Sequence, residues 1–328
     1  MKKLLSLLLT LTLLLGCLCL AACGETTPPE GERTPIRIGV MSGPTGMGMA
    51  KLMKDTPKAA DNSAPYIFEV YTDPQQALAD LAAKDLDAVC IPTNTAAAQA
   101  NKTADYVSVL AINTLGSLYL LSDGDTAVSS LEDLEGKTVH VSVPGSTTKP
   151  IVEYLLAEAG VTATVEVEVD HPTLVSRMAD TAEDHVDILV LPEPYVSKAL
   201  GQYPAYSVDL NLSTVWSDLS DNDLAMGCLV VRNEFLKEND EEIQLLLKDY
   251  KASIEYIANP DNRESAAEII VEAGILGAKT LATKALTNLQ GSIVYRDGAE
   301  MKATLVSFYD AIGLKQPTDA FYYAGIKD

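Results

Sequence analysis

The chain has 328 residues, of which 47% are hydrophobic, and its formal net charge is −22. This length and composition are typical of one large or two medium globular domains. The acidic balance argues against nucleic acid and anionic membrane surfaces as partners, because both are bound through clusters of Lys and Arg.

The N-terminus carries a signal for export. Lys2 and Lys3 are followed by an apolar run from Leu4 to Leu20. A basic start, an apolar stretch and then small residues form the pattern of a secretory signal peptide. No later apolar run reaches the length of a membrane span. We therefore expect the mature protein outside the cytoplasm.

The end of this signal resembles the bacterial lipobox, in which a cysteine is lipidated and becomes the first residue. The segment Leu20-Ala21-Ala22-Cys23 fits that pattern. We predict that residues 1–22 are a lipoprotein signal peptide, Cys23 is the lipidation site and residues 23–35 are a flexible, Pro-rich tether. A plain secretory signal or an uncleaved anchor is the alternative. Cleavage would remove two lysines and change the net charge from −22 to −24.

A strand, a polar loop and a helix follow the tether. Ile36–Met41 reads as a buried strand, Ser42–Gly48 is rich in Gly, Ser and Thr, and a helix is expected from Met49. Helix N-termini offer free N–H groups, and glycines let the backbone approach a ligand, so this loop predicts a polar binding site. An ordinary strand–helix turn is the alternative. Neither a P-loop nor a dinucleotide-binding fingerprint is complete here.

The rest of the first half alternates strands and helices. Strands are predicted at 66–71, 86–91 and 106–112. A helix is predicted from Gln75 to Lys84, with Asp73 as its N-cap. Polar loops follow two of the strands, at Pro92-Thr93-Asn94 and at Asn113-Thr114.

The second half repeats the alternation. Strands are predicted at 138–143, 164–169 and 186–191, and helices at 149–159, 172–179 and after Tyr195. Alternating strands and helices indicate a parallel or mixed sheet with helices on both faces.

Two loops of the first half recur in the second. Pro44 and Pro144, and Pro92 and Pro192, are each 100 residues apart and follow predicted strands. Two similar α/β lobes with polar loops at strand ends would enclose a cleft. Chance similarity between generic strand–helix units is the alternative.

The cysteines and histidines show no catalytic or metal-binding spacing. Cys90 and Cys228 lie in apolar runs, which favours buried free thiols over a disulfide. His140, His171 and His185 are isolated and lie outside the predicted loops, so each is expected to be structural or solvated. We therefore predict no metal and no cofactor.

The C-terminal third is predicted to be mostly helical. Residues 205–224 read as irregular, with Trp216 as a local packing anchor. Leu224–Arg232 is a strand that could return to the first lobe. Helices are predicted at 238–258, 263–273, 278–289 and 298–312.

Together these features resemble a known family. The chain looks like an ABC-transporter substrate-binding lipoprotein with the type II periplasmic-binding-protein fold. Within that fold it is similar to the nitrate/sulfonate/taurine and thiamine-pyrimidine binding group. The residues that carry the resemblance are Gly43-Pro44-Thr45-Gly46, the segment from Leu86 to Asn94, Leu131–Lys137, Pro192-Glu193-Pro194-Tyr195 and Gly227–Arg232.

The resemblance implies two Rossmann-like α/β lobes with a ligand cleft between them, joined by a two-strand hinge. Residues 36–115 and 225–328 would form lobe one, and residues 116–224 would form lobe two. The hinge would lie near Leu115–Leu121 and Leu224–Val230. The lobes would close over a ligand, and the closed form would dock on an ABC permease with its ATPase.

By position, the ligand loops of both lobes supply the candidate binding residues. Lobe one would provide Ser42, Gly43, Thr45, Gly46, Met47, Thr93, Asn94, Asn113 and Thr114, and lobe two Ser146, Thr147, Thr148, Glu193 and Tyr195.

These loops suit a carboxylate, a sulfonate or a neutral heterocycle, such as a thiamine-pyrimidine-like ring. Only Lys149 brings a positive charge near them, and an anion normally gains from an Arg fork, so sulfonate and nitrate fit less well. Glu193 could pair with an amine or a pyrimidine edge, or be a solvated carboxylate. Tyr195 could stack on a ring or cap the core.

Two other functions compete with the solute receptor of an importer. One is an enzyme on the same fold, which we do not expect, because no His–carboxylate pair or activated nucleophile is evident. The other is a surface lipoprotein for sensing or adhesion without a transporter. The sequence leaves the ligand's identity and the oligomeric state open.

Overall fold

The computed structural model describes residues 34–57, 64–144, 146–179, 181, 183–220 and 222–327. The predicted signal peptide, the lipidation site Cys23 and nearly all of the predicted tether lie outside these residues. Within the described ranges, no helix is both long and apolar enough to cross a membrane.

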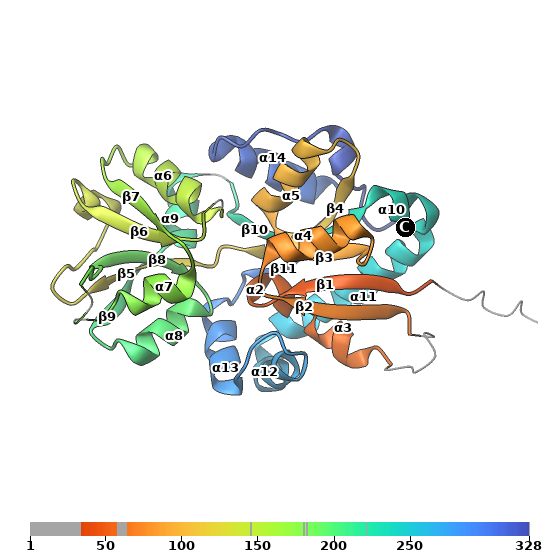
Figure 1. Ribbon diagram of the computed structural model, residues 1–328, viewed down its shortest axis with the longest axis horizontal. Helices are drawn as coiled ribbons and strands as arrows, with labels where there is room; N and C mark the ends of the chain where they lie inside the picture. Colours follow the sequence, from red (N-terminus) through yellow and green to blue (C-terminus); the bar gives the residue numbers. More distant parts are fainter. Residues whose placement is uncertain are drawn as a thin grey trace, which may run out of the picture. The chain divides into compact units, whose positions relative to one another are not determined.

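A six-stranded mixed sheet forms the first lobe (Figure 1). Its strands lie in the order β11–β4–β10–β3–β1–β2. They are β1 (Ile36–Met41), β2 (Tyr66–Tyr71), β3 (Ala88–Pro92), β4 (Val107–Leu115), β10 (Ala225–Arg232) and β11 (Ile293–Asp297). Strand β1 is parallel to β2 and β3, whereas β10 is antiparallel to both β3 and β4. The inner strands are mostly apolar because both faces of the sheet are buried.

A five-stranded sheet forms the second lobe, in the order β7–β6–β8–β5–β9. The strands are β5 (Leu118–Asp123), β6 (Thr138–Ser142), β7 (Thr164–Glu168), β8 (Ile188–Pro192) and β9 (Tyr206–Asn211). Strand β6 is parallel to β7 and β8, and β5 is antiparallel to β8 and β9. The two-lobe α/β fold predicted from the sequence is confirmed.

Helices cover both faces of each sheet (Figure 1). On the first sheet, one face carries α4 (Pro74–Ala83), α5 (Thr93–Lys102) and α14 (Gly298–Ala311), and the other carries α3 (Ala50–Asp55), α10 (Asn233–Glu238), α11 (Asp240–Ala258), α12 (Arg263–Glu272) and α13 (Lys279–Asn288). On the second sheet, α6 (Thr148–Glu158) and α9 (Leu212–Leu219) cover one face, and α7 (His171–Ser176) and α8 (Tyr195–Gln202) cover the other. The short helix α2 (Pro44–Met47) follows β1.

One buried carboxylate ties three strands of the first sheet together. Asp87, only 1% exposed, precedes β3. Its carboxylate accepts hydrogen bonds from the guanidinium groups of Arg37 on β1 and Arg232 on β10, both at 2.7 Å. It also accepts from the backbone N–H of Arg37 at 3.0 Å. These bonds satisfy a charge that would otherwise be costly to bury.

The chain crosses between the lobes at two adjacent places. Residues Gly116 and Ser117 link β4 to β5, and residues 220–224 link α9 to β10. The N–H of Gly116 donates to the carbonyl of Leu224 at 2.8 Å, so the two crossings are hydrogen-bonded to each other. A Cβ at Gly116 would lie 1.9 Å from Ser213 Oγ, so a larger residue would displace α9.

Trp216 is the packing anchor that the sequence predicts. It is fully buried, with ring centroids 4.7 Å from Tyr154 and 5.7 Å from Phe308. Because Phe308 lies on α14 of the first lobe, this contact joins the cores of the two lobes. Cys90 and Cys228 are free and buried, as predicted, and burial raises the pKa of the Cys90 thiol to about 12.

Several predicted elements are wrong in detail. Residues 205–224 contain β9 and α9 and are not irregular. Strand β9 was missed because it is an edge strand with mostly exposed, polar residues, so its apolar alternation is weak. Strand β11, which carries Arg296 and Asp297, was also missed. The helix expected at 238–258 begins earlier and is divided at Asn239.

Candidate ligand-binding site

A cavity of about 250 Å³ lies between the two lobes. Each wall consists of loops at the carboxyl ends of parallel strands, the usual position of ligands in open α/β sheets. Lobe one contributes Met41, Ser42, Gly43, Pro44, Thr45, Thr72, Pro74, Pro92 and Met226, and the second sheet's side contributes Ser117, Leu118, Val143, Ser146, Thr147, Thr148, His171, Pro192, Glu193, Pro194 and Tyr195.

The loop after β1 forms the lobe-one wall. Ser42 is fixed at both ends, since its N–H donates to Tyr71 at 2.7 Å and its hydroxyl donates to the carbonyl of Ile275 at 2.9 Å. Gly43 has a φ of +95°, a conformation that other residues rarely adopt. This turn places Thr45 against the cavity.

Eight of the predicted binding residues line this cavity. They are Ser42, Gly43, Thr45, Ser146, Thr147, Thr148, Glu193 and Tyr195. They come from three loops that are far apart in the sequence, and the fold brings them together. Their contact with a ligand remains a prediction.

Six predicted residues do not line the cavity. They are Gly46, Met47, Thr93, Asn94, Asn113 and Thr114. All are buried within lobe one. The sequence predicts loops at Thr93, Asn94, Asn113 and Thr114. In the structure, α5 begins at Thr93 and β4 extends through Thr114.

These residues have structural contacts in lobe one. The hydroxyl of Thr93 donates to the carbonyl of Ala225 at 2.7 Å, and that of Thr114 donates to Asn113 Oδ1 at 2.9 Å. Met47 belongs to the core between the first sheet and α11. The loops were misplaced because a strand's end cannot be located to within two residues from the sequence, and contact of these residues with a ligand stays a prediction.

His171 lines the cavity, although the sequence placed all three histidines outside the ligand loops. It begins α7, where Asp170 caps the helix by accepting from Thr173 N–H at 2.7 Å. Its Nδ1 lies 2.5 Å from Ser142 Oγ, and its ring packs against Tyr195 with 4.4 Å between centroids and a tilt of 40°. Burial lowers the pKa of His171 to about 4, so the imidazole is neutral near pH 7.

A signal for His171 was present in the sequence. Asp170-His171-Pro172 follows β7 just as Asp73-Pro74 follows β2, and Pro74 also lines the cavity. Both segments are an N-cap residue with a proline in the first helical turn. A third strand-end loop in each lobe could therefore have been included.

Glu193 is buried and not solvated, and its pairing with an amine or a pyrimidine edge of a ligand stays a prediction. The residue is 1% exposed, and its carboxylate accepts from Ser197 N–H at 3.3 Å and from Ser197 Oγ at 3.0 Å. Asn288 Nδ2, from α13 of lobe one, also donates to it. Burial and, to a lesser degree, this carboxylate raise the pKa of Tyr119 to about 12. Glu193 therefore caps α8 and joins the lobes, and it also forms part of the wall.

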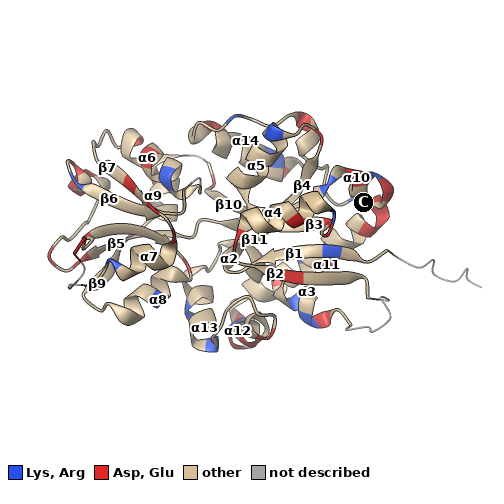
Figure 2. Ribbon diagram, viewed as in Figure 1, with Lys and Arg blue, Asp and Glu red and all other residues tan. Residues whose placement is uncertain are grey.

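Apart from the carboxylate of Glu193, the polar groups that line the cavity are neutral. The hydroxyls of Thr45, Ser117, Thr148 and Tyr195 have no hydrogen-bond partner among the described residues. No described Lys or Arg lines it, and Lys149 pairs with Glu153 at 3.6 Å. Figure 2 shows Lys and Arg on outer helices such as α3 and α13. Such a site can hydrogen-bond a neutral ligand, but it offers no counter-ion for an anion.

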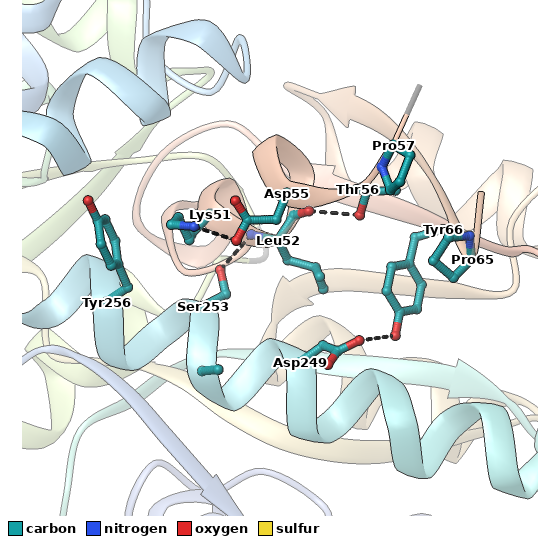
Figure 3. Close-up of a pocket in the computed structure, with 11 residues that line it drawn as sticks. Lys51, Leu52, Asp55, Thr56, Pro57, Pro65, Tyr66, Asp249, Ser253 and Tyr256 are labelled. Atoms are coloured by element: carbon teal, nitrogen blue, oxygen red, sulfur yellow. Dashed lines mark hydrogen bonds and ion pairs between the residues drawn. The ribbon is translucent and has the colours of Figure 1, made fainter. Parts of the chain in front are cut away.

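A second hollow lies within lobe one, between α3 and α11 (Figure 3). Its polar groups are mostly paired with each other. Lys51 pairs with Asp55, and Tyr66 OH donates to Asp249 at 2.7 Å. Its lining includes Pro57 and Pro65, and the structure does not describe the residues between 57 and 64. It therefore gives no argument for a ligand.

Three side chains in lobe two could in principle hold a metal ion. Asp123, His185 and Asp187 each place one donor atom within 4.8 Å of the others. His185 Nε2 lies 3.6 Å from an oxygen of each carboxylate. The cluster is outside the cavity lining, and acidic groups near a histidine are common without an ion, so it carries no metal assignment.

This architecture, two α/β lobes around a strand-end cavity, is that of the periplasmic binding proteins. The chain belongs to the NMT1/THI5-like family, whose model matches residues 67–263. No curated relative matches the sequence.

Solved structures share the fold. An ABC transporter protein from Parabacteroides distasonis is 21% identical, with a TM-score of 0.69 over 88% of this chain and 99% of that one. A zinc-bound ligand-binding component of an ABC-type import system from Staphylococcus aureus is 12% identical, with a TM-score of 0.68 over 89% and 97%. The periplasmic aliphatic sulphonate binding protein SsuA from Escherichia coli is 18% identical, with a TM-score of 0.68 over 88% and 92%. The predicted resemblance to this group is confirmed.

Proposed function

We propose that this protein is an extracytoplasmic solute-binding receptor that captures a small organic ligand and delivers it to an ABC importer. The observation that carries the proposal is the cavity between the lobes, which is lined by strand-end loops of both. A ligand held there contacts both lobes, so binding favours the closed arrangement over any open one. Proteins of the same fold are described as components of ABC-type import systems, which supports this role.

The proposed hinge consists of the two crossings near Leu115–Leu121 and Leu224–Val230. Residues 36–115 and 225–328 then move as lobe one, and residues 116–224 as lobe two. The hydrogen bond between Gly116 and Leu224 holds the crossings side by side, so both can bend about one axis. Closure would expel water and strengthen the hydrogen bonds to the ligand.

The proposed ligand is small, uncharged and flat, such as a thiamine-pyrimidine-like heterocycle. Tyr195 and His171 offer aromatic faces, Met41 and Met226 offer apolar surface, and the free hydroxyls offer hydrogen bonds. A sulfonate, as bound by the Escherichia coli relative, would meet no described Lys or Arg in the lining.

We further propose that the protein is held on the outer face of the cell membrane by a lipid on Cys23. Residues 1–22 would be removed as the signal peptide, and residues 23–35 would be the tether. Mass spectrometry of the processed N-terminus tests this part directly, since a diacylated Cys23 has a characteristic mass.

Native mass spectrometry of the protein purified in detergent, before and after mild denaturation, tests the receptor function. Tight ligands survive purification and stabilise the folded state by mass action. We expect a bound small molecule that is lost on denaturation. An empty protein that is not stabilised by any pyrimidine, sulfonate or amino-acid-like compound would instead support a lipoprotein without a transport role.

A further inference from the structure

A hydrogen bond to Ser142 determines which ring nitrogen of His171 remains available to a ligand. Its Nδ1 is 2.5 Å from the hydroxyl of Ser142, which lies on β6 and is 1% exposed. The ring also packs against Tyr195, with 4.4 Å between centroids and 40° between the ring planes, and this contact restricts its rotation. The imidazole is therefore held on two sides, by one hydrogen bond and by one aromatic face.

The other ring nitrogen is open to the cavity. Nε2 of His171 has no hydrogen-bond partner among the described residues, and it is not one of the buried atoms that lack a partner. It is therefore accessible, and His171 is one of the residues that line the cavity.

The burial of Ser142 determines the tautomer. The hydroxyl of Ser142 has no acceptor other than His171 Nδ1 among the described residues. If Nδ1 carried the proton, the Ser142 hydroxyl would be a buried donor without an acceptor, which costs about 1–3 kcal/mol. Ser142 therefore donates to Nδ1, and Nε2 carries the proton of the neutral ring.

The charges around His171 do not alter this assignment. Asp170 on the same element caps α7, and its attraction for the imidazolium is smaller than the opposing effect of burial on the pKa of His171. The ring lies against Ser142 of β6 and Tyr195 of α8. Burial raises the pKa of the Tyr195 hydroxyl above its ordinary value. Both neighbours are thus neutral near pH 7.

We propose that His171 is a specificity-determining residue, whose Nε2–H donates to an acceptor atom of the ligand, such as a ring nitrogen or a carbonyl oxygen. This inference rests on the proposed receptor function. It selects ligands that present an acceptor at this point, and it disfavours cations and N–H donors there, because two donors cannot pair. The hydroxyls of Ser117 and Thr148 can turn to suit a ligand, whereas this N–H cannot.

Two probes of the same shape test the proposal. 5-(Hydroxymethyl)pyrimidine has ring acceptors, and benzyl alcohol lacks them. Both are titrated by NMR into the wild-type protein, His171→Phe, Ser142→Ala and the control His185→Asn, which lies outside the cavity. We expect the wild type and His185→Asn to favour the pyrimidine about tenfold, as one hydrogen bond allows. His171→Phe should bind both probes equally, and Ser142→Ala should retain only part of the preference.

Imidazole 15N NMR gives a readout that needs no ligand. The resonance missing from His171→Phe should show a neutral ring with the proton on Nε2 at pH 7. A ring protonated on Nδ1, or a pyrimidine preference that survives in a folded His171→Phe, overturns the inference and leaves the receptor function intact. A wild type that binds neither probe and purifies without a solute overturns the receptor function, and this inference with it.

Discussion

The two lobes use the same strand–helix units, but they present them differently to the cavity. In each lobe a central strand is parallel to two neighbours, and the antiparallel strand that follows the crossing lies beside them. In lobe two, Glu193 and Tyr195 after β8 reach the cavity. In lobe one, Thr93 and Asn94 after β3 are buried. Similar topology therefore does not place equivalent residues in the cavity lining.

The cause of this difference lies in what covers each strand end. In lobe one the hydroxyl of Tyr309, on α14, donates to the carbonyl of Thr93 at 2.9 Å. The hydroxyl of Thr93 donates in turn to the carbonyl of Ala225 on β10. Lobe two has no described helix equivalent to α14 over β8. Lobe one thus covers this strand end, and lobe two supplies more of the polar wall.

The largest difference in stability between equivalent positions is predicted for Asp87 and Asp187. They begin the similar segments 87–92 and 187–192 of the two lobes. Asp87→Asn removes the buried carboxylate that pairs with the guanidinium of Arg232 and leaves only the exposed Glu234 at 3.5 Å as its charged partner among the described residues, so we expect a loss of about 3–5 kcal/mol in the free energy of unfolding. Asp187 has a 59% exposed side chain, and Asp187→Asn should change the stability by less than about 0.5 kcal/mol. Urea denaturation of both variants measures the contrast, and equal losses would contradict it.

A smaller effect is predicted for Gly46 and Ser146, which also lie 100 residues apart. A Cβ at Gly46 would lie 1.8 Å from the carbonyl oxygen of Met41, which is backbone and cannot turn aside. Gly46→Ser should therefore destabilise the protein by about 1–3 kcal/mol.

Ser146→Gly is the matched control for this position, because it removes only a hydroxymethyl side chain, whose hydroxyl donates to the carbonyl of Ser142 at 3.1 Å. We expect a loss of about 1 kcal/mol at most. Thermal unfolding followed by circular dichroism compares the two. A Gly46→Ser variant as stable as the wild type would show that the lobe-one loop is not held by this close contact.

Acid should affect lobe two through His171. Burial lowers its pKa to about 4 in the folded chain, against an ordinary value of 6.5. The unfolded chain therefore binds more protons between these values, and the free energy of unfolding falls as the pH falls from 6.5 towards 4. The loss from this one group should be about 1 kcal/mol at pH 5.5.

Comparing His171→Phe with the wild type isolates that contribution. Both proteins keep His140, whose pKa burial also lowers, so its effect cancels in the difference. Urea midpoints measured from pH 7.5 to pH 5 should fall less steeply for the variant. Parallel pH profiles would mean that His171 titrates normally in the folded protein.

The sequence predicts the architecture well and the cavity wall only in part. Strand–helix alternation and apolar runs are local properties, so β1, β2 and the returning strand β10 could be located. Ser42 and Thr148 could be placed in the wall because they follow clear strand ends. The sequence cannot show which strand ends are later covered, and so it assigned Thr93 and Asn113 to the site.

His171 and Glu193 show a second limit. The sequence does not mark His171 as a ligand residue, because its loop is a short N-cap segment and not a stretch rich in Gly, Ser and Thr. Glu193 was placed correctly, but its partner Asn288 lies 95 residues away on α13. A contact of that separation depends on the tertiary fold and has no local pattern in the sequence.

The smallest predicted effect would show whether the two lobes move relative to each other. Trp216 is the only tryptophan of the chain, and it lies where the cores of the lobes meet. Its Nε1–H donates to the carbonyl of Asn222 in one crossing at 2.7 Å, and its ring faces Phe308 of lobe one. Hinge motion would change both neighbours, whereas binding without motion would change neither, because Trp216 does not line the cavity.

We therefore expect the solute found by native mass spectrometry, when added back to ligand-free protein, to shift the emission of Trp216 by less than unfolding does. Phe308→Leu should reduce this response without weakening binding, because Phe308 is also outside the cavity lining. An emission spectrum that is unchanged at saturating solute would mean that the crossings do not bend. Ligand would then enter a preformed cavity, and the asymmetry between the lobes would reflect packing alone.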